Sequence, residues 1–111
     1  MLHTIHCIAC EGGVPPLSKE EVMKLMPEIA HWQVSDDHKL IFRHFNFKNF
    51  YQTIAFVNAI AWIANQENHH PDLEVGYHDC LVKYHTHAVS GLTKNDFICA
   101  AKIDQLIAAS S

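Results

Sequence analysis

Basic residues are scarce in this chain of 111 residues, which has eight Lys and Arg against twelve Asp and Glu. The formal charge of −4, with the basic side chains scattered, gives no electrostatic footprint for nucleic acid. Long apolar runs are also lacking, because no segment reaches the roughly 18 residues of a membrane span, and residues 1–10 lack a signal-peptide pattern. We therefore expect a cytoplasmic protein that binds neither nucleic acid nor membrane.

Cysteine is limited to four residues, too few and too unevenly spread for a disulfide framework. We expect Cys80 and Cys99 to be reduced, small core residues. Cys7 and Cys10, with two histidines beside them, have the ligand types and close spacing of half a zinc site. A structural zinc site normally draws a second ligand pair from elsewhere, so the alternative is a pair of exposed thiols.

The chain length allows one domain, and 49% hydrophobic with 18% charged residues is an ordinary globular balance. The opening residues have neither helical nor strand periodicity, and Gly12-Gly13 with Pro15-Pro16 marks where they end. We predict a flexible N-terminal tail over residues 1–13 and a single domain over residues 14–111.

Hydrophobic periodicity and capping signals predict helices and strands in alternating groups. The first predicted helix begins at the capping box Ser18–Glu21, the second spans residues 47–67, and the third begins at the box Thr93–Asp96. The predicted strands cover residues 32–34, 40–45, 72–77 and 80–87. This order, α-β-β-α-β-β-α, predicts an α+β fold in which three helices pack on one face of a four-stranded antiparallel sheet.

The helix over residues 47–67 carries an unusually broad apolar surface. Its predicted core stripe consists of Phe50, Ile54, Val57, Ala61 and Ala64. Further aromatic residues widen this surface, which indicates a helix covered on more than one side, by the sheet and a neighbour or by another subunit. Core packing is the expected role of each aromatic residue in this helix.

Four histidines lie at the ends of predicted elements. His69 and His70 follow the long helix, and Pro71 forces the helix to end near them, so the two rings must point in different directions. His85 and His87 alternate on one strand and share its polar face. Either pair could be structural, as helix caps or surface residues. Together they could also form a three-histidine metal site, although no acidic companion is evident from the sequence.

The segment that holds these histidines resembles the pterin-4a-carbinolamine dehydratase family. The matching residues are Asn68-His69-His70-Pro71, Tyr77, Thr86-His87, Gly91-Leu92-Thr93 and Asp96. The resemblance implies an α+β fold, dimers or tetramers of one chain, and a pterin substrate. The implied reaction dehydrates 4a-hydroxytetrahydrobiopterin to quinonoid dihydrobiopterin, which recycles the cofactor of aromatic amino acid hydroxylases. It needs no metal and no redox cofactor.

The resemblance also assigns roles to individual residues. The three family histidines are His69, His70 and His87, and Asp96 and Trp32 match a carboxylate and an aromatic residue near the substrate. Acidic residues that many relatives have before the histidine pair are replaced here by asparagine, so we expect Glu67 to supply similar charge.

Histidine suits the implied reaction because imidazole exchanges protons near neutral pH. We expect His69 and His87 to act as general acid and base, with His70 mainly orienting the pterin. The alternative function is an interaction module without essential catalysis, because animal relatives double as dimerization cofactors of a transcription factor.

Overall fold

The computed structural model describes residues 1–8 and 15–110. Its elements are η1 (Leu2–Thr4), α1 (Lys19–Leu25), η2 (Met26–Ile29), β1 (Gln33–Val34), β2 (Ile41–Asn46), α2 (Phe50–Glu67), β3 (Asp72–Val75), β4 (Asp79–Tyr84), η3 (His87–Val89) and α3 (Lys94–Ser110). Apart from the short 3-10 turns, this is the predicted order. None of the helices in the described ranges is both long and apolar enough to cross a membrane.

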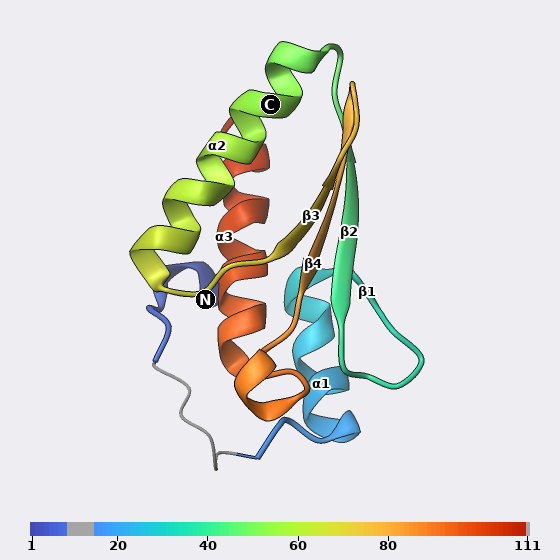
Figure 1. The fold of residues 1–111 in the computed structure, drawn as a ribbon. Coiled ribbons are helices and arrows are strands. Elements are labelled where there is room, and N and C mark those ends of the chain that lie inside the picture. The colour runs from blue at the N-terminus through green and yellow to red at the C-terminus, as the bar shows by residue number, and fades with distance from the viewer. Residues whose placement is uncertain (9–14, 111) are drawn as a thin grey trace.

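The four strands form one antiparallel sheet in the order β1-β2-β4-β3. Figure 1 shows the helices on one side of this sheet, with α2 and α3 running along it. Along the central strand β4, Cys80, Val82 and Tyr84 are buried, whereas the residues between them are partly exposed. The predicted α+β fold and the period-two burial of β4 are therefore confirmed.

Helix starts follow the predicted capping signals. The Ser18 hydroxyl accepts the Glu21 amide, and the Glu21 carboxylate accepts the Ser18 amide. At the start of α3, the Asp96 carboxylate accepts the Thr93 amide at 2.9 Å. Helix α2 begins after Asn49, whose side chain accepts the amide three residues later, and this cap was not predicted.

The buried face of α2 differs from the predicted stripe. Its buried residues are Thr53, Phe56, Ile60, Ile63 and Glu67, and each of the first four precedes an expected residue by one position. Phe50, Tyr51 and Trp62 are largely exposed, so the expectation that every aromatic residue of this helix packs in the core was wrong. The error has a physical reason: both faces of the helix are apolar, and periodicity alone does not say which one faces the sheet.

Residues 1–8 pack against the domain rather than extending from it. Leu2 is buried in the core, and the Lys102 ammonium donates to the His3 carbonyl at 2.9 Å. Figure 1 shows this segment beside the C-terminal end of α2 and against α3. Of the cysteines, Cys80 and Cys99 are buried and free as predicted, while Cys10 lies outside the described residues.

Candidate active site

A cavity of about 540 Å³ opens where the C-terminal end of α2, the end of β4 and the N-terminal segment meet. This volume is typical of small-molecule sites. Five histidines line it: His6, His69, His70, His85 and His87. The other lining residues are Cys7, Ile8, Gln66, Glu67, Asn68, Thr86, Ala88 and Asn95. The fold therefore brings the three candidate catalytic histidines to one cavity, His69 and His70 from the end of α2 and His87 from the turn η3.

His69 is turned inward by the end of α2. Asn68 adopts a left-handed conformation (φ 51°, ψ 42°), and the His69 amide donates to the Ala64 carbonyl at 3.1 Å. The His69 side chain is only 12% exposed, and its ring stacks on the buried Tyr84 ring at a centroid distance of 5.8 Å. Backbone and packing together hold this imidazole in one orientation.

Asp96 lies beneath His69 and is fully buried. Its Oδ1 atom lies 2.6 Å from His69 Nε2, while Oδ2 accepts the Thr86 hydroxyl at 2.8 Å and the Thr93 amide. A carboxylate oxygen accepts hydrogen bonds, so the 2.6 Å contact is a hydrogen bond when His69 Nε2 carries the hydrogen. This assignment leaves His69 Nδ1 as the nitrogen available for proton exchange.

Tyr84, the other aromatic group at His69, is poorly suited to proton transfer. Burial raises the pKa of its hydroxyl above the ordinary tyrosine value, so the phenol stays neutral. Its contribution to the site is the flat apolar surface on which the imidazole rests.

His70 and His87 lie at the open side of the cavity. Both are exposed, and their ring centroids are 6.4 Å apart. The strand β4 ends at Tyr84, so His85 and His87 do not alternate on one strand as expected. His87 begins the 3-10 turn η3, and the centroid of the His85 ring lies 4.2 Å from that of the His87 ring. As predicted, the adjacent rings of His69 and His70 point in different directions, one buried on Asp96 and one exposed.

Glu67 forms the opposite wall together with the N-terminal segment. Its carboxylate accepts the Cys7 amide at 2.7 Å and contacts His6 Nδ1 at 2.9 Å, while Lys102 Nζ lies 3.9 Å away. Burial disfavours the charged form, yet these three partners outweigh it and hold the pKa of Glu67 below its ordinary value. Glu67 lines the cavity, but its charge is directed at the N-terminal segment.

The lowered pKa of Glu67 predicts how docking of the N-terminal segment depends on pH. Ionised Glu67 stabilises the docked segment fully above about pH 4.5, and this stabilisation is lost as the pH falls through the lower pKa of the folded state. We expect the Cys7 amide signal in an NMR titration to keep its docked position through pH 5 and to shift only below pH 4.5. In a Glu67→Gln variant this transition should disappear; a Cys7 signal that still shifts in the variant would contradict the assignment.

Trp32 takes a different place from the other candidate residues. It is 4% exposed, packs on Phe45 and Tyr84, and its indole N–H donates to Asp104 at 2.8 Å. Arg43 donates to the same carboxylate oxygen at 2.7 Å. Trp32 therefore lies in the core and not among the residues that line the cavity.

Sequence reasoning missed several residues of this site. His6, Cys7 and Asn95 line the cavity because the N-terminal segment docks there, where the Ile8 amide donates to the Asn95 side chain at 3.1 Å. Asp72, beside His85, was also missed. The contacts of Cys7 and Ile8 span more than 60 residues without a periodic signal, whereas the register of the β3–β4 hairpin could have located Asp72.

Comparisons with known proteins place this chain in a family. A sequence model of the family "Pterin 4 alpha carbinolamine dehydratase" matches residues 15–106. A Legionella pneumophila (strain Corby) protein provisionally named a pterin-4-alpha-carbinolamine dehydratase is 59% identical over 96% of this chain and 95% of its own length. A relative of the same name from Nitrosomonas eutropha is 58% identical over 91% of this chain and 88% of its own.

A solved structure extends the likeness to three dimensions. The crystal structure of a "transcriptional coactivator/pterin dehydratase" from Brucella melitensis has a TM-score of 0.78 and 28% identity, and it covers 82% of this chain and 97% of the Brucella chain. This chain belongs to the pterin-4-alpha-carbinolamine dehydratase family.

Proposed function

We propose that this protein dehydrates 4a-hydroxytetrahydrobiopterin to quinonoid dihydrobiopterin and so recycles the cofactor of aromatic amino acid hydroxylases. The observation that carries the proposal is the convergence of His69, His70 and His87 on one cavity in a member of this family. The cavity volume suits a bicyclic ring, and its rim of amides and imidazoles offers both donors and acceptors to a pterin.

The reaction requires two proton transfers and no electron transfer. The C4a–O bond breaks as the hydroxyl takes a proton and leaves as water, while N5 loses its proton and the C4a=N5 double bond forms. One group must therefore donate a proton to the C4a hydroxyl, and another must accept the proton from the neighbouring N5. Two imidazoles do both near neutral pH.

His69 and His87 fill these two roles in the proposal. Asp96 holds the His69 ring and keeps a hydrogen on Nε2, so Nδ1 can accept the N5 proton. His87 lies in the exposed turn η3, where it can protonate the departing hydroxyl. His70, close to His87 but free of such a partner network, binds and orients the pterin ring. Asp96 acts through His69 and is a positioning residue.

A direct assay tests the function. Purified protein, treated with EDTA, is mixed with 4a-carbinolamine generated by an aromatic amino acid hydroxylase, and formation of the quinonoid product is followed by absorbance. We expect the protein to raise the dehydration rate well above the uncatalysed rate without added metal. No acceleration would refute the proposal.

The exposed apolar face of α2 supports a homo-oligomer. Phe50, Tyr51 and Trp62 are 48%, 81% and 70% exposed, and a second copy presenting the same face would bury them. Light scattering of the purified protein would give the assembly state. A stable complex with a different protein and no turnover would instead favour an interaction role, such as the coactivator role for which the Brucella protein is named.

A further inference from the structure

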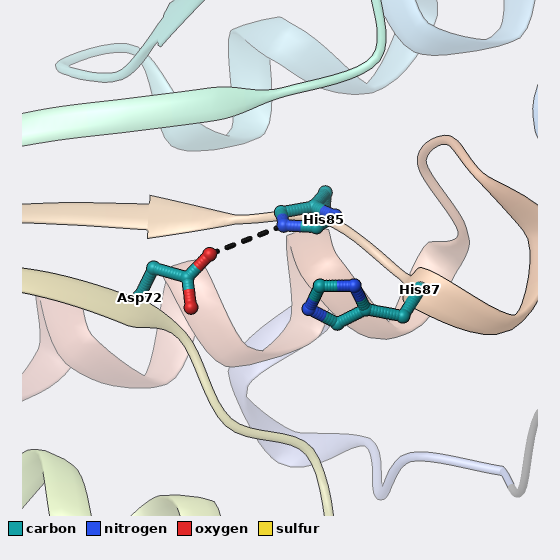
Figure 2. A group of neighbouring side chains, drawn as sticks. All are labelled: Asp72, His85 and His87. Carbon is teal, nitrogen blue, oxygen red and sulfur yellow. Dashed lines mark hydrogen bonds and ion pairs between the residues drawn. The ribbon is translucent and has the colours of Figure 1, made fainter.

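His87, one of the proposed catalytic pair, also belongs to a second cluster, with Asp72 and His85. Figure 2 shows their side chains pointing toward one another from the start of β3, the end of β4 and the turn after it. One donor atom from each residue lies within 4.8 Å of the other two. Asp72 and His85 take no part in the chemistry described above.

The strand register explains why these groups meet. Asp72 pairs with Lys83 across the β3–β4 ladder, so His85 is two residues beyond the partner of Asp72, on the same face. His85 Nε2 lies 3.2 Å from Asp72 Oδ2, and the His85 and His87 rings meet edge to face at an interplanar angle of 66°. An exposed ion pair would account for the first contact but not for the second imidazole beside it.

The donor set and its spacing suit a transition-metal ion. Two imidazoles and a carboxylate are ligands of zinc, nickel and copper, whereas magnesium and calcium prefer oxygen. In a tetrahedral zinc site, with bonds of about 2.0–2.2 Å, neighbouring donor atoms lie about 3.3 Å apart. The His85–Asp72 contact already has this spacing. The exposed His87 ring can close the remaining gap by rotation.

We propose that Asp72, His85 and His87 bind one zinc-type divalent ion, with water at the fourth position, and that the bound ion inhibits the enzyme. Inhibition follows because coordination occupies the His87 nitrogen that protonates the substrate. The claim of inhibition therefore rests on the proposed function, whereas the claim that the three residues bind zinc does not. The ion is thus an inhibitor at this site and not a catalytic cofactor.

Zinc binding is measured first, by competition with a chromophoric chelator. The background is Cys7→Ser with Cys10→Ser, so that thiols near the N-terminus supply no ligand. We expect one zinc ion per chain, and at least tenfold weaker binding after His85→Gln or Asp72→Asn. His44→Gln is the matched control, because His44 forms a similar exposed pair with Asp79 at 2.8 Å and belongs to no such cluster among the described residues. Equal affinity in all variants, or no stoichiometric binding, would overturn the site.

Inhibition is measured next, in the dehydration assay with added zinc. Zinc should slow the parent protein and EDTA should restore it. Asp72→Asn, at a residue that does not line the cavity, should keep the parent rate without zinc and need at least tenfold more zinc for the same inhibition. Stoichiometric binding together with no dehydration by the metal-free protein would refute the proposed function and leave the metal site standing. If zinc binds but the dehydration rate does not change, the claim that the ion inhibits the enzyme is refuted.

Discussion

Replacing His69 and His87 together by alanine is expected to abolish catalysed dehydration, with kcat/KM falling by about 10⁴-fold or to the uncatalysed rate. A positioned acid or base is typically worth about 10²- to 10⁴-fold, and each half of the reaction loses its group in this variant. Because the two groups act in one elimination, each single variant should lose nearly as much as the double. The measurement is the initial rate of quinonoid product formation at matched protein concentration.

His44→Ala is the control for this pair. It removes an exposed imidazole that pairs with Asp79 at 2.8 Å and is not among the residues that line the cavity. Its rate should stay close to wild type. His70→Ala should raise KM more than it lowers kcat, since that ring binds the pterin. A double His69/His87 variant with the wild-type rate would remove the acid–base assignment.

Asp96→Ala is expected to lower both the free energy of unfolding and the rate. The substitution leaves three donors without their buried acceptor: His69 Nε2, the Thr86 hydroxyl and the Thr93 amide. Removing one partner of such a buried network typically costs about 3–5 kcal/mol. In the folded fraction, the released His69 ring should lower kcat by about 10²-fold, because misplacement of a reacting group by about 1 Å has that effect.

Asp104→Asn is the control that separates the loss of stability expected for Asp96→Ala from its loss of rate. Asp104 is a partly exposed residue of α3 that also accepts two hydrogen bonds, from Trp32 and Arg43, and it does not contact His69. This variant should lose stability in urea unfolding while keeping the wild-type kcat. Asp96→Asn, which keeps the shape and one acceptor oxygen, should lie between wild type and Asp96→Ala in stability. A wild-type kcat in folded Asp96→Ala would show that the carboxylate does not position His69.

Local signals in the sequence were sufficient for most of the fold. The capping box at Ser18, the period-two pattern of β4 and the helix stop before Pro71 each depend on neighbours within a few residues, and each appears in the structure as predicted. Those same signals place the histidine pair at the end of α2, where it lines the cavity.

Long-range choices could not be read in this way. Which face of α2 packs on the sheet depends on what covers it, because Phe50 and Phe56 are equally apolar and only the second is buried. The N-terminal segment docks through Glu67 and Asn95, 60 and 87 residues from their partners, and no periodicity encodes such contacts. The core position of Trp32 likewise depends on Asp104, 72 residues away.

The most direct test of the account is a crystal structure of the protein with a bound reduced pterin, such as 7,8-dihydrobiopterin. We predict the bicyclic ring inside the histidine cavity, with one ring nitrogen of His69 and one of His87 each about 2.6–3.2 Å from the N5 or C4a region, directly or through one water. A pterin bound elsewhere, or one held in the cavity with both imidazoles out of reach, would contradict the account.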